Sequence, residues 1–278
     1  MSVKITTLIE NNPDQKQEFL AEHGLALYIE VDGLRILFDT GQSGNFLENA
    51  IRMNIDLNKL DYIIISHGHY DHANGLNELL AKITTKPTLI VGSEFFRKKY
   101  KLLDDGKYRY NGINFDESFI STKVPVIKVH GECYRLSENV TIYHHFDRTN
   151  DFEVLNSKFY YQDGDQKVSD DFADEIVLAV NSPEGLVAIV GCSHGGVVNI
   201  LKTVAAKNRV PLYGVIGGTH LVEADARRIN RTIAVFKEMN LKMVAVSHCT
   251  GEQGLKAVQD QMPEQFVFNN TANVIELD

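Results

Sequence analysis

Residues 63–72 constrain this chain more than any other part of the sequence. Three consecutive isoleucines, residues 63–65, are followed within seven positions by three histidines and one aspartate, which are His67, His69, Asp71 and His72. Crowded imidazoles repel one another when protonated and gain nothing from burial when neutral, so folding alone does not explain them. Neutral imidazole and ionised carboxylate are good ligands for zinc, iron or manganese. The pattern therefore predicts a metal site at the end of a buried strand.

The spacing of these four residues predicts two metal ions. His67 and His69 are two positions apart, so both can reach one ion from a segment that turns at the end of a strand. Asp71 and His72 come at the next turn and can reach a second ion. Two ions about 4 Å apart form a clamp that many hydrolytic enzymes use.

Three further histidines follow apolar runs that we expect to be strands. The runs are residues 186–190, 212–216 and 243–246, and the histidines after them are His194, His220 and His248. Strands of α/β proteins present such residues at one edge of a sheet, where sites assemble from distant parts of the chain. The expected ligands of the first ion are His67, His69 and either His194 or its neighbour. The expected ligands of the second ion are Asp71, His72 and His248. His220 is a candidate ligand, proton donor or substrate contact.

Five more motifs accompany the histidine-rich stretch. They are Glu22-His23-Gly24-Leu25, Leu37-Phe38-Asp39-Thr40-Gly41, Gly191-Cys192-Ser193-His194, Gly217-Gly218-Thr219-His220-Leu221 and Ser247-His248-Cys249-Thr250-Gly251. With these motifs the chain resembles the metallo-β-lactamase superfamily over nearly its whole length. Within the superfamily it is similar to the subgroup that includes dihydropterin ribofuranosylaminobenzene phosphate synthase and its bacterial relatives, although less so between about residues 93 and 170.

The resemblance implies a four-layer αββα sandwich of the mixed α/β (α+β) class, formed by residues 1–278 as a single domain. The less similar segment, about residues 93–170, is predicted to be an insertion or a lid over the site. It contains a basic run, residues 97–101, which either attracts an anionic substrate or forms a solvated face. Nearer the N-terminus, Asp32-Gly33 predicts a hairpin, because both residues tolerate positive φ.

The chain departs from the superfamily pattern at the acid that usually bridges the two metals. That acid follows a glycine at a strand end, where this sequence has Cys192 or Ser193. A thiolate ligand would favour zinc or iron over manganese, and a small buried residue is an equal interpretation of Cys192. The usual upstream histidine is also not evident, and Asp171, Asp174 and Glu175 occupy that region.

One acidic residue outside the histidine-rich stretch has two interpretations. Asp39 follows the expected strand 34–38. It either accepts a hydrogen bond from a ligand histidine and orients that ring, or it forms a turn.

The composition disfavours several classes of protein. The net charge of -9 makes nucleic-acid binding unfavourable, because phosphates would be repelled. The three cysteines show no paired spacing, which is typical of a reducing compartment. No apolar run reaches the roughly 18 residues of a membrane span. We therefore expect a cytoplasmic protein that binds neither nucleic acid nor membranes.

Together these observations predict a metal-dependent hydrolase that activates water with two divalent ions, zinc before iron or manganese. The resemblance implies a small phosphorylated or pterin-like substrate and a phosphoester-type bond. Asp71 would bind metal and steer protons, while His220 would protonate the leaving group. One alternative is a synthase that acts on a phosphoribosyl donor and a pterin. The other is a metal-binding sensor or interaction protein without turnover, which the substitution at Cys192 suggests.

Overall fold

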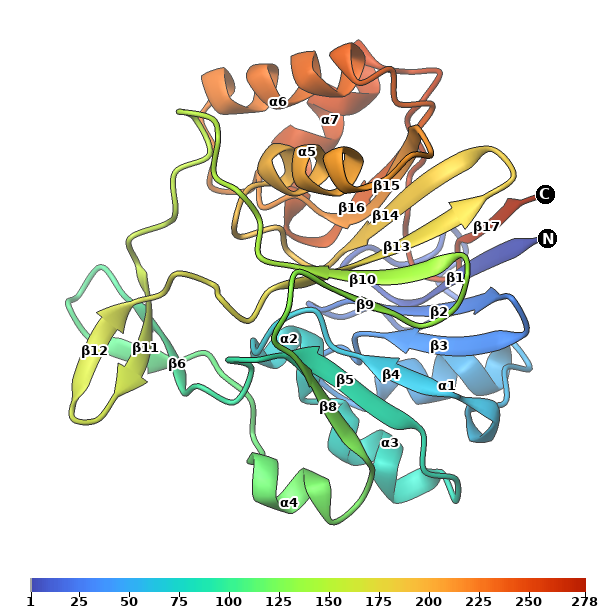
Figure 1. Cartoon of the computed structure of the whole chain (residues 1–278), viewed down its shortest axis with the longest axis vertical. Helices are drawn as coiled ribbons and strands as arrows, with labels where there is room; N and C mark the ends of the chain where they lie inside the picture. The colour runs from blue at the N-terminus through green and yellow to red at the C-terminus, as the bar shows by residue number, and fades with distance from the viewer. Residues whose placement is uncertain (1) are drawn as a thin grey trace.

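Two β-sheets lie face to face and form the centre of the molecule (Figure 1). A computed structural model describes residues 2–278. The first sheet has the spatial order β17 (Val274–Leu277), β1 (Val3–Ile9), β2 (Ala26–Val31), β3 (Leu34–Phe38), β4 (Tyr62–Ile64), β5 (Thr88–Gly92) and β8 (Val126–Val129). The second has the order β16 (Met243–Ser247), β15 (Leu212–Gly218), β14 (Gly185–Val190), β13 (Ile176–Ser182), β10 (Val140–His144) and β9 (Cys133–Arg135).

Helices cover the outer face of each sheet, which confirms the predicted αββα sandwich. The first sheet is covered by α1 (Asn45–Arg52), α2 (Tyr70–Ala73) and α3 (Leu76–Lys82). The second is covered by α5 (Val197–Lys207), α6 (Ala226–Glu238) and α7 (Gly251–Gln261). The short helices η1 (Leu57–Lys59), η2 (His248–Thr250) and α4 (Glu117–Ser121) lie in the connections. No helix within residues 2–278 is both long enough and apolar enough to cross a membrane.

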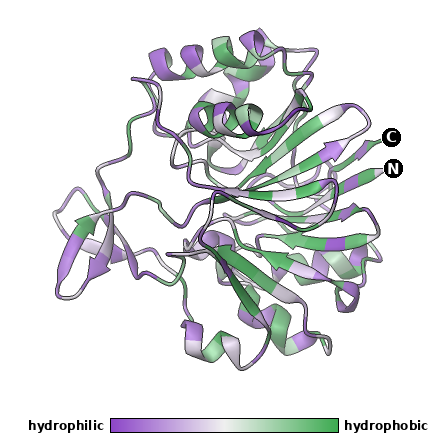
Figure 2. Ribbon diagram, viewed as in Figure 1, coloured by the Kyte–Doolittle hydropathy of each residue, from purple (hydrophilic) through white to green (hydrophobic). Residues whose placement is uncertain are grey.

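The strands are apolar on both sides because each sheet is covered on both faces. In β3, Ile36 and Phe38 pack between the two sheets, whereas Leu37 packs against the helical layer. In β14, Ile189 packs between the sheets and Val190 against the opposite helices. Figure 2 shows the hydrophobic colour concentrated on these central strands. The predicted hairpin is present, with positive φ at Asp32 (55°) and Gly33 (75°).

The direction of the strands brings the predicted site residues to one edge. Strands β3 and β4 are parallel, and so are β14, β15 and β16. Their carboxyl ends are followed by Asp39, His67, Cys192, His220 and His248. The site therefore lies where the ends of both sheets meet.

A third, four-stranded sheet projects from this edge (Figure 1). Its order is β12 (Gln166–Ser169), β11 (Phe159–Asp163), β6 (Lys99–Leu102) and β7 (Tyr108–Tyr110). Segment 93–170 also contributes β8 to the first central sheet and β9 and β10 to the second. That this segment is an insertion stays a prediction, and only the four-stranded sheet has the position expected of a lid.

A buried lysine joins this projecting sheet to the centre. The Lys99 Nζ lies 2.7 Å from the Asp170 Oδ2 and 2.8 Å from the Asp174 Oδ1, and all three side chains are 1% exposed. The second carboxylate oxygen of Asp174 accepts a hydrogen bond from the backbone N–H of Gly68, at 2.7 Å. Gly68 lies between His67 and His69, so the ion cluster supports the histidine-rich loop directly.

We expect the substitution Lys99→Met to destabilise the protein by about 3–5 kcal/mol, because it leaves two buried carboxylates without their cation. The measurement is denaturant unfolding followed by circular dichroism, since the chain contains no tryptophan. Lys256→Met is the matched control, because Lys256 pairs with Asp260 on the exposed surface of α7 and such pairs contribute little. Equal losses in the two variants would contradict this role for Lys99.

Candidate metal centre

The first predicted group of ligands, His67, His69 and His194, comes together in the structure. The ring centroid of His194 lies 4.9 Å from that of His67 and 4.8 Å from that of His69. The Nε2 atoms of His69 and His194 are buried and have no hydrogen-bond partner within residues 2–278. Burial holds the pKa of all three histidines well below the usual value, so the rings are neutral. Neutral rings with free, buried nitrogens are what a metal ion requires.

The second predicted group, Asp71, His72 and His248, also comes together. The Asp71 Oδ2 lies 3.7 Å from the His72 Nε2 and 3.3 Å from the His248 Nε2. The two histidine Nε2 atoms are 3.1 Å apart. Burial alone would raise the pKa of Asp71, but the neighbouring histidines outweigh it and hold this pKa well below its usual range. The carboxylate is therefore ionised, as a ligand must be.

Cys192 lies between the two groups. Its Sγ is 3.1 Å from the His72 Nε2. Ligand atoms of Asp71, His72, Cys192 and His248 all lie within 4.8 Å of one another, and the same holds for His67, Cys192 and His194. The Ser193 Oγ instead donates a hydrogen bond to the Gly218 carbonyl at 2.8 Å. Of the two residues at the place of the usual bridging acid, the cysteine therefore faces the centre. Its thiol pKa is raised well above the usual value by burial.

Asp39 is the residue that orients His72. Its carboxylate accepts hydrogen bonds from the Ser66 backbone N–H (2.7 Å) and the Ser66 hydroxyl (2.9 Å). The same carboxylate lies 2.6 Å from the His72 Nδ1. With the Nδ1 side occupied, the His72 Nε2 points into the centre. Partners of this kind fix the tautomer and orientation of ligand histidines.

Two glutamates that the sequence analysis did not assign to the site hold the other loops. The Glu175 carboxylate accepts hydrogen bonds from the backbone N–H groups of His194 (2.7 Å) and Gly195 (2.9 Å). Burial raises the pKa of Glu175 to about 7. Glu10, at the end of β1, accepts a hydrogen bond from the backbone N–H of His248. In the sequence, Glu10 directly follows β1 and Glu175 directly precedes β13. An acid at a strand end is common, so this position alone does not identify a residue that supports a metal centre.

The loops at the strand ends carry unusual backbone conformations. Positive φ angles occur at Asp39 (62°), Ser193 (59°), His220 (48°) and His248 (53°). Such conformations are costly for residues other than glycine and cluster at functional sites. Each of the four lies within three residues of the end of β3, β14, β15 or β16, so this edge carries a group of such conformations beside the candidate ligands.

A cavity of about 310 Å³ opens over the centre. Its floor includes ligand candidates from both groups, and its walls include Lys101, Arg109 and Phe159 of the third sheet. His23 also lines it, with its Nε2 3.2 Å from the Asp71 Oδ2. The sequence analysis quoted His23 only as part of a motif and did not assign it to the site.

His220 lies in the wall of this cavity beside the first group. Its ring centroid is 4.3 Å from that of His194, and its Nε2 is 3.4 Å from the Glu223 Oε2. Its backbone N–H donates a hydrogen bond to the Cys249 Sγ at 3.3 Å. Burial alone would lower the pKa of His220, but Cys249 and Glu223 outweigh it and raise this pKa to about 9.

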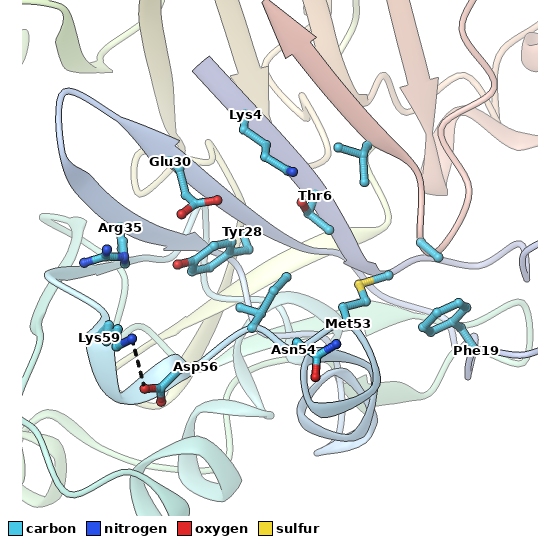
Figure 3. Close-up of a pocket in the computed structure, with 13 residues that line it drawn as sticks. Lys4, Thr6, Phe19, Tyr28, Glu30, Arg35, Met53, Asn54, Asp56 and Lys59 are labelled. Atoms are coloured by element: carbon cyan, nitrogen blue, oxygen red, sulfur yellow. Dashed lines mark ion pairs between the residues drawn. The ribbon is translucent and has the colours of Figure 1, made fainter. Parts of the chain in front are cut away.

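A larger hollow, of about 540 Å³, lies away from the histidines (Figure 3). Its lining mixes cations and anions, among them Lys4, Glu30, Arg35 and the exposed pair Asp56–Lys59. It contains no histidine or cysteine among its lining residues. Candidate ligands therefore line the smaller cavity and not this hollow.

The chain is similar to known proteins over most or all of its length. The sequence model of the metallo-beta-lactamase superfamily matches residues 21–198. An uncharacterised protein of Methanocaldococcus jannaschii, MJ0448, is 28% identical over 271 residues, which cover 98% of this chain and 99% of that protein. The 7,8-dihydropterin-6-methyl-4-(beta-D-ribofuranosyl)-aminobenzene-5'-phosphate synthase of the same organism is 28% identical over 302 residues, with coverage of 99% and 97%. Among solved structures, Tm1679, a metal-dependent hydrolase of the beta-lactamase superfamily, aligns with a TM-score of 0.86 at 28% identity, covering 99% of both chains.

We expect Asp39→Asn to weaken zinc binding by about 10- to 100-fold, because the His72 ring loses its anionic partner. The affinity is measured by competition with a chromophoric chelator. Asp32→Asn, in the exposed hairpin turn between β2 and β3, is the matched control and should leave the affinity unchanged. An unchanged affinity in the Asp39 variant would show that His72 does not depend on this carboxylate.

Proposed function

The chain belongs to the metallo-beta-lactamase superfamily, and from this premise we propose that it is a metal-dependent hydrolase that cleaves a phosphoester-type bond in a small anionic molecule. One observation carries the proposal. Ring nitrogens of the candidate ligands converge under a cavity whose wall includes two cations: the His67 Nε2 lies 3.0 Å from the His69 Nδ1, and the His72 Nε2 lies 3.1 Å from the His248 Nε2. The buried His194 Nε2 has no hydrogen-bond partner in residues 2–278, which is rare in proteins, and a divalent ion would satisfy it.

The residues present fit two ions. The first would be held by His67, His69 and His194, and the second by Asp71, His72 and His248. Cys192 would stand between the two ions, in place of the usual bridging acid. Its thiolate favours zinc or iron over manganese. When bound, such ions activate a water molecule and stabilise the negative charge that develops during hydrolysis.

The protein's own groups would bind and orient the substrate and supply the proton. Asp71 is ionised in the structure and can direct protons as well as bind metal. His220 is the proposed proton donor to the leaving group, because it faces the cavity and has Glu223 behind its Nε2. The planar guanidinium of Arg109 suits a phosphate group, and Lys101 adds a second cation to the same wall.

Elemental analysis of anaerobically purified protein is the first test of this proposal. We expect about two ions per chain, with fewer in His69→Ala and in His248→Ala, because each variant removes a ligand of one proposed site. His130→Ala, at an exposed histidine outside the cavity, is the control and should keep both ions. One ion that is lost only in the His69 variant would mean that the second site is not functional.

The role of the cationic wall is tested with the variant Arg109→Met. We expect its KM for 4-nitrophenyl phosphate or bis(4-nitrophenyl) phosphate to rise about tenfold with little change in kcat, since a contact made equally in ground and transition states is lost. Lys107→Met removes one charge from the exposed turn of the same hairpin and should leave KM unchanged. A loss confined to kcat would contradict a role for Arg109 in substrate binding.

A second candidate function is a synthase. It is favoured by the full-length similarity to the dihydropterin-based synthase of Methanocaldococcus jannaschii. Binding of a dihydropterin together with failure to hydrolyse any phosphoester would favour this alternative. Full metal loading without turnover or pterin binding would favour a sensor or interaction protein.

A further inference from the structure

A second hollow adjoins the cavity over the centre. It has a volume of about 420 Å³ and lies between residues 154–158 and the start of α6. Both hollows are lined by His194, His220 and Glu223. They therefore meet at these three residues, directly beside the first group of candidate ligands.

Glu223 lies where the two hollows meet, and its carboxylate contacts a side chain from each of them. Its Oε1 lies 3.0 Å from the Nζ of Lys101, which belongs to the first cavity. Its Oε2 accepts a hydrogen bond from the side chain of Asn156, which belongs to the second hollow. His220, 3.4 Å from the same oxygen, faces both spaces. A group that reacts beside His220 can thus extend into either hollow.

The second hollow carries its own cation without a partner. Arg228 lines it, and the Nε of Arg228 is buried with no hydrogen-bond partner in residues 2–278. The structure records no ion pair for Arg228 within the same residues. Lys158, the other cation of this wall, is paired with Asp104 at 2.7 Å. The guanidinium of Arg228 lines the hollow and has no carboxylate partner in the described part of the chain, so an anion in the hollow would supply its counter-charge by charge-assisted hydrogen bonding.

We propose that the second hollow binds the part of the substrate beyond the bond that is cut, and that this part carries a negative charge. The inference rests on the proposed hydrolase function and narrows its substrate class. The substrate would bear anionic groups on both sides of the scissile bond, one near Arg109 and one near Arg228. A diphosphate, or a phosphodiester between two charged units, fits this description, whereas a monoester with a neutral leaving group does not.

The test is equilibrium binding of two non-hydrolysable probes to the zinc-loaded full chain, measured by calorimetry. Methylphosphonate carries one anionic group and methylenediphosphonate carries two. We expect Arg228→Met to weaken binding of the diphosphonate about tenfold and to leave binding of the monophosphonate unchanged. Arg227→Met, which removes the exposed neighbouring charge on α6, should change neither affinity. Thermal unfolding of both variants shows whether the fold is intact.

The other outcomes separate this inference from the function on which it rests. If Arg228→Met binds both probes as the unsubstituted chain does, or loses both equally, the second hollow is not an anionic subsite, and the hydrolase proposal stands. His69→Ala, which removes a proposed metal ligand, should weaken both probes. If the zinc-loaded chain binds neither probe, the proposed function and this inference both fail.

Discussion

Buried carboxylates that accept hydrogen bonds from loop backbone hold the candidate metal centre together. Three site loops are held in this way, and the loop that carries His67 has two such acids. The pairs are Asp39 with Ser66, Asp174 with Gly68, Glu175 with His194, and Glu10 with His248. A buried charge is tolerated only when hydrogen bonds or counter-charges satisfy it. These hydrogen bonds satisfy the buried acids and at the same time fix the backbone of the three loops, so the candidate ligands on them keep one geometry.

The third sheet extends this support outward. Because side chains alternate along a strand, its two faces differ. Lys99, Lys101, Arg109 and Phe159 occupy one face: Lys99 enters the buried ion cluster, and the other three line the cavity. Tyr100, Tyr108, Tyr110 and Tyr160 occupy the opposite face, in contacting pairs. The sheet is thus part of the site as well as a cover for it.

The sequence of the basic run 97–101 did not predict the environment of its individual side chains. The two interpretations were an attraction for anions and a solvated face. Strand alternation separates the members of the run, so that Lys99 is 1% exposed between two aspartates and Lys101 pairs with Glu223 in the cavity wall. The residues around positions 97–101 do not reveal these two environments. The acids that pair with the lysines, which are Asp170, Asp174 and Glu223, lie more than 70 residues away along the chain.

The sequence by itself determined the Asp32-Gly33 hairpin and the grouping of histidines at strand ends, and its resemblance to a known superfamily implied the sandwich class. The hairpin and the strand-end histidines depend on local patterns, namely apolar runs, turn residues and the spacing of ligand types, which act within a few positions. Only the tertiary structure decided that Cys192 rather than Ser193 faces the centre, that Glu10 and Glu175 hold its loops, and that Arg228 reaches a second hollow. Each of these depends on which strand ends meet across two sheets, and contacts between distant segments leave no periodic signal in the chain.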